Sequence, residues 1–398
     1  MDLLEKILLR LPVKELIRSK QNHNIYLHPS GFLHQINPTC VYPRKDNSLL
    51  LKKVGIIPFA NNSKNRFIHL DVHDEFDGQL CYYFIRSCNG LLLWKSSPTE
   101  FPISPLYGEF LQECSFYVSN PTTGHCVRID RFGYDLFSRF CYDINASFSE
   151  PFLAFEPWKS PHYKVIFFSK LVGATKMKVS VYSSETGSWS KHDAVPSFPN
   201  DIEILKNDGV YCNGAIHWYV LPGNYTILAS LSVYFDIDRL CFKNLPKLPF
   251  TVPYNVINGA YFVECRGNLH LIARACKQAG LDYDIWELKE DYSGWIRKYN
   301  VDLTTFKETT PRSFQKFRSL SLCVTSQPPN ENEEEESMLA ILVVGNSTVV
   351  SYNLKDHSST IIYQGDDGFY PVPFGGPYFL GGPYFETLVS ISPGYNKL

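Results

Sequence analysis

The sequence predicts a mainly-β chain, in which a short N-terminal helical segment is followed by a β-propeller of about six blades. The prediction depends on one strand pattern, on its repetition along the chain and on the turn residues beside it. The pattern is clearest at Met177–Trp189, where Met177, Val179 and Val181 fall on one side at every second position. Apolar residues with this period indicate a half-buried strand.

The polar side of this strand and its turn complete the pattern. Lys178, Ser180 and Tyr182 occupy the alternate positions, facing away from the apolar side. Ser183–Ser188 then supplies turn residues, among which Gly187 can adopt a positive φ. The stretch therefore predicts a strand, a tight turn and a returning strand.

Looser copies of this hairpin recur along the chain. Their aromatic anchors are separated by 65, 52, 52 and 66 residues; these anchors are Tyr117, Tyr182, Tyr234, Trp286 and Tyr352. A hairpin repeat of about 50 residues is typical of a propeller, in which each repeat is one blade. A β-sandwich built from the same hairpins is the alternative, because periodicity does not establish ring closure.

A second set of hairpins precedes the anchors. Asn89-Gly90 and Asn213-Gly214 stand between apolar runs, and Gly267-Asn268 is a looser third case. Such dipeptides favour two-residue hairpin turns. The anchors account for five blades. We expect a sixth to combine strands from Val54–Asp71 with strands from the C-terminal end.

Composition limits the possible functions. Among 398 residues, 38 Lys and Arg balance 40 Asp and Glu, so charge gives no reason to expect nucleic acid or an anionic membrane as a partner. The longest apolar runs have the length of strands, and the N-terminus lacks the features of a cleaved signal. Eleven scattered cysteines without a C-x-x-C pair favour reduced thiols. We therefore expect an intracellular protein of the cytoplasm or nucleus that is not secreted.

The N-terminal residues predict two short amphipathic helices. Leu4, Ile7, Leu8 and Leu11 recur at helical spacing, and Pro12 then ends the first helix. The second helix runs over residues 13–20 and carries Leu16 and Ile17. Two such helices cannot cover both apolar faces by themselves, so they must pack on the β domain or on a partner.

These N-terminal residues also resemble a known family. DLLEKILLRLPVKELIRSK is similar to the first half of the F-box of plant proteins. Later segments resemble the F-box-associated domain of the same proteins, in the same order; they are SCNGLLLW, SNPTTG, LAFEPWKSPHYKVI, VYSSETGSW, GVYCNGAIHW, RGNLHLI and DYSGWIRKYNVDL. The resemblance extends from residue 1 to about residue 365. It divides the chain into a partial, truncated F-box at 1–20, a linker at 21–47 and a propeller domain at 48–398.

The resemblance implies a non-catalytic role in protein ubiquitination. The chain would be the substrate-recognition subunit of a Skp–cullin–F-box ubiquitin ligase, with the propeller holding a target protein of unknown identity. The N-terminal helices would bind the Skp-type adaptor, and through it cullin, by the residues Leu4, Ile7, Leu8, Leu11, Pro12 and Leu16. Because the F-box is incomplete, a propeller interaction module that recruits no ligase is the alternative. A propeller enzyme acting on a carbohydrate or small metabolite is a second one.

The sequence offers little chemistry for catalysis or cofactor binding. His69 and His73 are four residues apart, but on a strand their Cβ atoms would be about 13 Å apart, too far to share a metal ion. His217 and His270 stand among core residues and are predicted to be hydrogen-bonded structural residues. No cofactor or metal is therefore expected. The tandem copies GGPYFL and GGPYFE at Gly375–Glu386 are interpreted as a lengthened loop.

Overall fold

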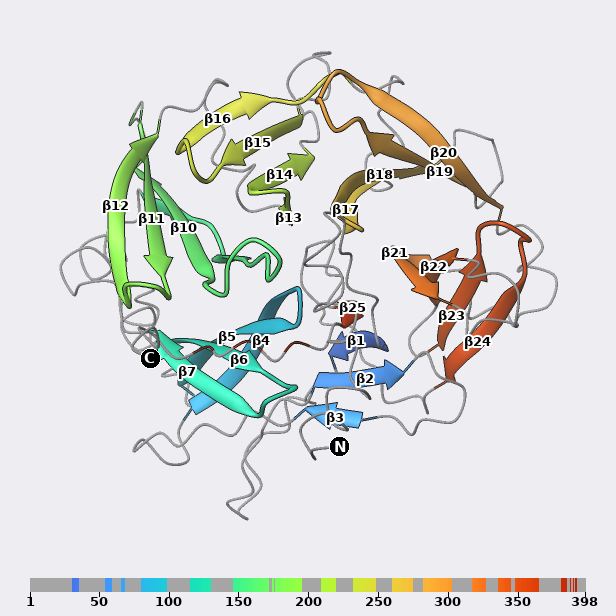
Figure 1. The fold of residues 1–398 in the computed structure, drawn as a ribbon, viewed down its shortest axis with the longest axis horizontal. Coiled ribbons are helices and arrows are strands. Elements are labelled where there is room, and N and C mark those ends of the chain that lie inside the picture. Colours follow the sequence, from blue (N-terminus) through green and yellow to red (C-terminus); the bar gives the residue numbers. More distant parts are fainter. Residues whose placement is uncertain are drawn as a thin grey trace, which may run out of the picture. The chain divides into compact units, whose positions relative to one another are not determined.

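In the described part of the chain, every regular element is a β-strand (Figure 1). The computed structural model describes residues 31–35, 54–58, 66–68, 80–98, 115–129, 146–171, 174, 176–194, 209–219, 232–247, 260–274, 282–302, 317–326, 336–344, 348–364, 381–384, 387, 389 and 391. Within these residues, twenty-five strands form six antiparallel sheets. The chain divides into two compact units, residues 1–193 with 380–398 and residues 194–379. This architecture confirms the mainly-β prediction and supplies the six expected sheets.

The first unit contains a sheet built from both ends of the chain. Its order is β25-β1-β2-β3, with the bounds β1 Gly31–Gln35, β2 Val54–Pro58, β3 Arg66–Ile68 and β25 Gly381–Tyr384. Strand β1 pairs antiparallel with β2 and with β25. The expectation that the sixth sheet draws on both ends of the chain is therefore confirmed.

Two expectations about local structure are corrected by this sheet. Gly31–Gln35 was expected in a linker but is strand β1, and Gly381–Tyr384, in the second tandem copy, was expected in a loop but is strand β25. Both strands are short, so their pairing depends on a contact between the ends of the chain, which no local pattern reports. Pro383 lacks a backbone N–H, which an edge strand such as β25 can tolerate.

The other two sheets of the first unit follow the chain. One has the order β4-β5-β6-β7, with the bounds β4 Leu80–Cys88, β5 Leu91–Pro98, β6 Phe116–Asn120 and β7 His125–Ile129. The next has the order β12-β11-β10-β8, with β9 also pairing with β10. Its bounds are β8 Ala146–Phe148, β9 Phe152–Ala154, β10 Lys164–Leu171, β11 Met177–Ser183 and β12 Ser188–Ala194.

The second unit holds three four-stranded sheets, each in sequential order. The first comprises β13 Val210–Cys212, β14 Ala215–Tyr219, β15 Ser232–Asp236 and β16 Cys241–Asn244. The second comprises β17 Ala260–Cys265, β18 Asn268–Arg274, β19 Asp282–Leu288 and β20 Trp295–Asp302. The third comprises β21 Phe317–Ser326, β22 Glu336–Val344, β23 Thr348–Asn353 and β24 Ser359–Gln364.

The five aromatic anchors mark equivalent strands. Each stands in the third strand of its sheet, namely β6, β11, β15, β19 and β23. The hairpins at Asn89-Gly90 and Asn213-Gly214 connect the first two strands of their sheets, as expected. In the third case the positive-φ pair is Arg266-Gly267, with φ of 55° and 71°, one residue earlier than predicted. The repeat was therefore predicted in the correct phase, apart from this one-residue shift.

Strand β11 is more buried than its alternation predicted. Ser180 and Tyr182, expected on the polar face, are only 5% and 2% exposed, while Lys178 is exposed. Tyr182 packs on Tyr163 and Trp189, with ring centroids 6.2 and 5.4 Å apart. A strand between two others can be covered on both faces, and alternation alone cannot report the second covering layer.

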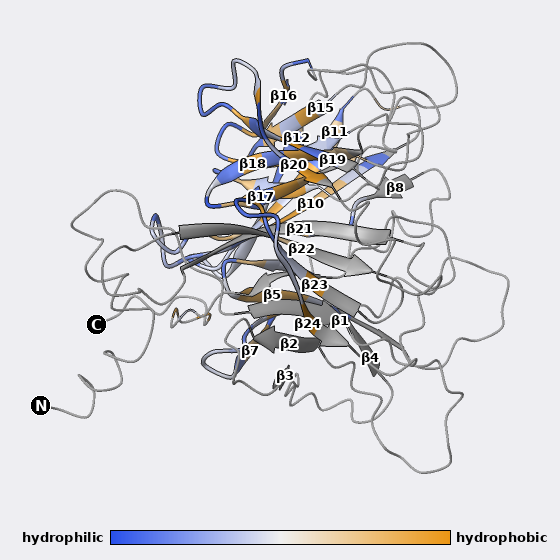
Figure 2. Cartoon of the chain, turned by 90° about the vertical axis from the view of Figure 1, so that its right-hand side faces the viewer, coloured by the Kyte–Doolittle hydropathy of each residue, from blue (hydrophilic) through white to orange (hydrophobic). Residues whose placement is uncertain are grey.

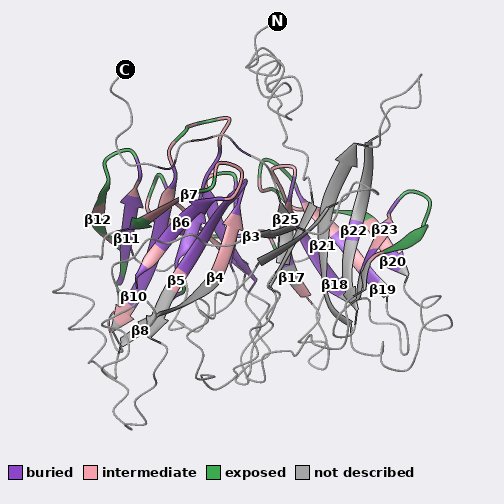
Figure 3. Ribbon diagram, turned by 90° about the horizontal axis from the view of Figure 1, so that it is seen from below, coloured by how far each residue is buried: buried purple, intermediate pink, exposed green. Residues whose placement is uncertain are grey.

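Buried residues lie along inner strands such as β10 and β18, whereas exposed residues lie on the turns and on outer strands such as β12 and β20 (Figure 3). The same division is visible in hydropathy (Figure 2). Strands β5 and β14 carry continuous buried runs, Leu91–Trp94 and Ala215–Tyr219. Fully burying one large apolar side chain stabilises a fold by about 1.5–3 kcal/mol. Trp94 also has a partner for its indole N–H, which donates to Ser119 Oγ at 2.8 Å.

Candidate functional site

The predicted adaptor-binding residues lie outside the described part of the chain. This applies to all six of them, Leu4, Ile7, Leu8, Leu11, Pro12 and Leu16, and to the first and last parts of the expected linker. The candidate site that the structure does describe is a set of neighbouring turns in the first unit. We call it the turn surface and define it as residues 89–90, 120–125, 156–162 and 184–187 with Thr387, Val389 and Ile391.

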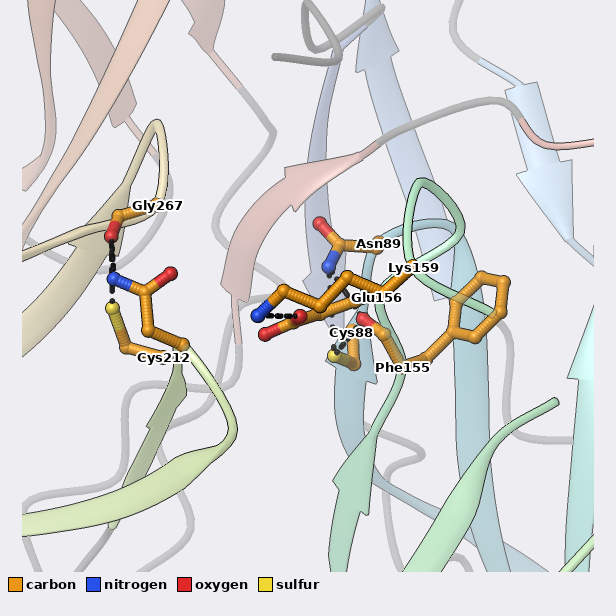
Figure 4. Close-up of polar contacts among 8 residues, drawn as sticks. Cys88, Asn89, Phe155, Glu156, Lys159, Cys212 and Gly267 are labelled. Atoms are coloured by element: carbon orange, nitrogen blue, oxygen red, sulfur yellow. Dashed lines mark hydrogen bonds and ion pairs between the residues drawn. The ribbon is translucent and has the colours of Figure 1, made fainter. Parts of the chain in front are cut away.

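The turn surface begins with a two-residue hairpin turn. Asn89 and Gly90 have φ of 45° and 92°, the left-handed region that Asn and Gly tolerate better than other residues. Asn89 Nδ2 donates to the Phe155 carbonyl oxygen at 2.6 Å, and the Cys88 thiol donates to the same oxygen at 3.4 Å (Figure 4). The Phe155 carbonyl oxygen, just after β9, thus accepts two hydrogen bonds from the hairpin between β4 and β5. These bonds join the sheet that contains β4 and β5 to the sheet that contains β9.

The next segment, residues 156–162, follows that carbonyl directly. Glu156 is buried and forms an ion pair with the exposed Lys159 (Figure 4). The backbone N–H groups of Lys159 and Ser160 both donate to the Glu156 carbonyl oxygen, at 2.9 and 3.0 Å. The turn is therefore fixed, with Trp158 half-buried and Lys159 reaching solvent.

Residues 184–187 are tied to the end of the same segment. The Tyr163 N–H donates to Ser184 Oγ at 2.9 Å, and the Ser184 N–H donates to the Tyr163 carbonyl oxygen at 3.0 Å. Gly187 closes the turn by donating to the Ser183 carbonyl oxygen, with the predicted positive φ, 64°. Glu185, Thr186 and Gly187 are exposed beside it, whereas Ser184 is buried.

The C-terminal residues join the turn surface through buried polar contacts. The Asn120 amide donates to the carbonyl oxygens of Thr387 and Val389, both at 2.9 Å, and is fully buried. The Thr387 N–H donates to Thr122 Oγ1 at 3.2 Å. Tyr163 Oη lies 3.4 Å from the Ile391 carbonyl oxygen, and burial raises the pKa of this phenol above its usual value. The C-terminal segment is thus attached to both neighbouring sheets.

The second unit repeats the hairpin contact. The Asn213 amide and the Cys212 thiol both donate to the Gly267 carbonyl oxygen, the thiol at 3.3 Å (Figure 4). Gly267 belongs to the equivalent turn of the next sheet. In that turn Arg266 replaces the asparagine, and the Gly267 N–H donates a hydrogen bond to Glu264 Oε1 at 2.7 Å. The same connection between neighbouring sheets is therefore made in both units.

Sequence reasoning missed this contact although its signal was present. Cys-Asn-Gly occurs at Cys88 and at Cys212, and Cys-Arg-Gly occurs at Cys265. The dipeptides were recognised as turns, but the cysteines were interpreted only as scattered core thiols. A cysteine at the same position before three equivalent turns was the available signal.

The two histidines singled out from the sequence are structural, as predicted. His217 is fully buried, and its Nδ1 and Nε2 lie 3.3 Å from the Val210 carbonyl oxygen and 2.8 Å from Tyr292 Oη. His270 is also buried, with Nδ1 3.1 Å from the Asn268 carbonyl oxygen and Nε2 3.2 Å from Glu287 Oε2. Both rings are held by backbone and side-chain groups of the core.

The described residues include neither a metal-binding cluster nor a membrane-spanning helix. Among them, no group of three or more His, Cys, Asp or Glu is placed to hold a metal ion. Nor does any helix of the described part have the length and apolarity needed to cross a membrane. The turn surface instead presents short, internally bonded turns on a rigid sheet scaffold, an arrangement that many binding proteins use.

Comparison with known proteins identifies the family. The F-box associated beta propeller domain family matches residues 52–391. An F-box protein of Arabidopsis thaliana, At5g07610, is 29% identical over 346 residues, which cover 78% of this chain and 72% of that protein. The F-box/kelch-repeat protein At3g23880 of the same plant is 22% identical over 335 residues, covering 77% and 80%. The chain therefore belongs to the plant F-box proteins that carry an F-box-associated β-propeller domain.

Solved structures resemble the chain only weakly. A puromycin-hydrolyzing peptidase of Mycobacterium tuberculosis has a TM-score of 0.37 and 9% identity, over 86% of this chain and 46% of that chain. This likeness is too slight to carry a conclusion.

Proposed function

We propose that this protein is a substrate-recognition subunit of a Skp–cullin–F-box ubiquitin ligase. The observation that carries the proposal is the family match over residues 52–391. Two F-box relatives, 29% and 22% identical, agree with it. In this role the predicted N-terminal helices bind the Skp-type adaptor, and the propeller domain binds a target protein. The place of action is intracellular, in the cytoplasm or nucleus, where the ligase operates.

No covalent step falls to this chain in the proposed function. Its contribution is proximity, because a bound target is held at a high effective concentration near the ubiquitin-loaded enzyme. The turn surface is the candidate for target binding. Its short turns are held by backbone and amide hydrogen bonds, so little conformational entropy is lost when a partner binds them.

The adaptor is proposed to bind the apolar side of the first helix. Leu4, Ile7, Leu8 and Leu11 recur at helical spacing there, with Pro12 and Leu16 continuing the contact. Burying two leucines in an interface contributes roughly 3–6 kcal/mol before the costs of association. A carboxylate at each position would remove this contribution and bury a charge.

Co-purification of the full chain with the Skp-type adaptor tests the proposal. We expect the wild-type chain to retain the adaptor and the double variant Leu8→Asp, Leu11→Asp to lose it. The double variant Ile296→Asp, Ile361→Asp is the matched control, because it introduces the same charge at residues that are 42% and 50% exposed, in strands β20 and β24. Retention of the adaptor by the control shows that added charge alone does not abolish binding.

Two results would contradict the proposal. Equal recovery of the adaptor with the wild type and the double variant would exclude the helices as the binding element. Failure of the wild type to retain any adaptor would favour the second candidate, a propeller module that binds proteins without recruiting a ligase. That candidate is supported by the family match, which begins at residue 52, after the F-box-like residues.

A further inference from the structure

His217 packs against two tyrosines that come from different sheets of the second unit and that also contact each other, with ring centroids 4.9 Å apart. Tyr234 belongs to β15, beside the His217 strand, and its ring centroid lies 5.6 Å from the imidazole at an interplanar angle of 21°. Tyr292 belongs to the turn between β19 and β20, and its ring lies 5.9 Å away at 26°. The imidazole and Tyr234 thus both join the β13–β16 sheet to a turn of the β17–β20 sheet.

The hydrogen bonds of His217 define its protonation state. Its Nδ1 faces the Val210 carbonyl oxygen, which can only accept, so Nδ1 carries the proton. In the neutral ring, Nε2 is then an acceptor, and it receives the Tyr292 hydroxyl at 2.8 Å. In this arrangement the Tyr292 hydroxyl donates to an unprotonated Nε2, and a proton on Nε2 would force the hydroxyl to reorient and accept.

The turn that carries Tyr292 is short and contains backbone strain. Tyr292 has a φ of 57°, which is unfavourable for an aromatic residue. Its N–H donates to the Lys289 carbonyl oxygen at 2.8 Å, and the Lys289 N–H donates to the Gly294 carbonyl oxygen at 2.9 Å. Contacts outside the turn must offset the strain, and the stack with His217 is one of them. Trp295, whose indole donates to the Pro246 carbonyl oxygen at 3.3 Å, is a second.

The charged and titratable groups around the stack act in opposite directions. Lys243 Nζ lies over the Tyr234 ring, 5.7 Å from its centroid, and forms an ion pair with Asp236 at 2.9 Å. Burial raises the pKa of Tyr292, and Cys212, Tyr234 and Asp236 add to this effect. Burial likewise lowers the pKa of His217, to about 4, against its backbone hydrogen bonds. A proton on His217 would gain from the tyrosine faces and Asp236, and lose from Lys243 and from burial.

We propose that His217 is an acid-sensitive latch, whose protonation releases the turn at residues 289–294 from the β13–β16 sheet. A proton on Nε2 converts the acceptor for Tyr292 into a donor and places a charge in a fully buried ring. Opening of the turn restores water to the imidazole and relieves the φ strain at Tyr292. The released segment carries the exposed residues Lys289, Glu290 and Asp291, so opening repositions a charged turn.

Hydrogen–deuterium exchange of the full chain, followed by mass spectrometry and corrected for intrinsic rates, tests the latch. Between pH 6.5 and 4.5 we expect the opening equilibrium of residues 289–294 to increase roughly fortyfold, because the open form binds a proton with an ordinary histidine pKa. Protection of strand β11, in the other unit, should remain unchanged over the same range. Unchanged protection of residues 289–294 over this range would overturn the proposal, as would simultaneous loss of protection in both places.

A variant without a titratable ring is the decisive comparison. His217→Phe keeps an aromatic ring against the tyrosines but cannot titrate, so its turn should lose the pH dependence. The control His125→Gln, at an exposed position, should keep the wild-type dependence. If His217→Phe does not fold, His217→Gln replaces it, because its amide can donate and accept without titrating. Wild-type pH dependence in His217→Phe or His217→Gln would overturn the proposal. Tyr292→Phe should open more at every pH yet keep the pH dependence, since His217 still titrates in it.

Discussion

The Asn89 amide nitrogen lies 2.6 Å from the carbonyl oxygen of Phe155, and this contact joins two sheets of the first unit. The Cys88 thiol donates to the same oxygen, and Cys212 and Asn213 repeat the arrangement on Gly267 in the second unit. The contact is made by a hairpin turn, so the residue that shapes the turn also joins the sheets. Replacing the asparagine therefore affects two properties that must be separated, the conformation of the turn and the hydrogen bond between the sheets.

Asn89→Gly and Asn89→Asp separate them. Glycine keeps the left-handed turn and removes the amide donor, so we expect a loss of about 1 kcal/mol in the free energy of unfolding. Aspartate keeps the shape but directs a carboxylate at a carbonyl oxygen, and we expect about 2 kcal/mol. Urea titrations followed by both fluorescence and circular dichroism measure the losses and test for a single transition.

The second unit supplies the control for this prediction. Asn213 is exposed, whereas Asn89 is only half-exposed, so water replaces the lost donor more readily at Asn213. Asn213→Asp should therefore cost less than Asn89→Asp. Equal stability of Asn89→Asp and the wild type would show that the amide contact does not hold the sheets together.

Leu240 has a φ of 52° in a turn where other sheets place glycine. The equivalent last turn residues of two sheets are Gly124 and Gly187, with φ of 73° and 64°. A non-glycine residue in this region costs about 1–2 kcal/mol, so we expect Leu240→Gly to raise the free energy of unfolding by up to 1 kcal/mol. Part of the gain is lost with the contacts of the half-buried side chain and with the added freedom of the unfolded chain.

Gly124→Ala is the reverse experiment. An added Cβ at Gly124 would meet no atom within 4 Å. Any loss in the free energy of unfolding therefore measures the backbone strain of a non-glycine residue at this φ. We expect a loss of about 1 kcal/mol, measured as a lower urea midpoint at unchanged slope. A destabilised Leu240→Gly combined with a neutral Gly124→Ala would show that these turns carry no φ strain.

The sequence predicted the local features of the fold and missed those that depend on distant partners. The third strands were located because Tyr117 and its four equivalents stand in alternating patterns, which are local. Strand β1 pairs with a strand some 350 residues further along, and neither GFLHQ nor GGPY has the composition of a long strand. Within the turn surface, the turns were predicted from Asn and Gly, whereas their attachment to Phe155 and Thr387 depends on tertiary contacts.

Asn120, at the end of β6, is predicted to hold the C-terminal segment of the first unit in place. Its buried amide donates to two carbonyl oxygens, those of Thr387 and Val389, and Asn120→Asp would face both with a carboxylate. We expect a loss of roughly 2–4 kcal/mol at pH 7. The measurement is the free energy of unfolding together with the rate at which carboxypeptidase removes the C-terminal residues.

A related asparagine provides the control for Asn120. Asn353 occupies the same place in the turn after β23, and its side-chain contacts with Lys355 and Asp356 are exposed. Asn353→Asp should change stability by only a few tenths of a kcal/mol. Similar small losses in both variants, with no change in carboxypeptidase sensitivity, would refute a fastening role for Asn120.

Glu287 makes the free energy of unfolding depend on pH in the acidic range. The hydrogen bond from His270 lowers its pKa to about 2, and Lys298, whose Nζ lies 3.0 Å from Oε1, adds to the effect against partial burial. Because the pKa in the folded state is below the unfolded value of 4.5, the stabilisation is complete above pH 4.5 and is lost as pH falls from 4.5 to about 2. It amounts to less than about 3.4 kcal/mol, because water screens the partly exposed carboxylate.

Glu287→Gln should remove this part of the pH dependence. The difference in unfolding free energy between wild type and variant, measured by urea titration at pH 7, 4.5 and 3, cancels contributions from other groups such as His217. We expect the difference to shrink as pH falls below 4.5, because the wild-type carboxylate is protonated there. The exposed Glu290→Gln is the control and should show a smaller change. A difference for Glu287→Gln that stays constant down to pH 3 would mean that His270 and Lys298 do not stabilise the carboxylate.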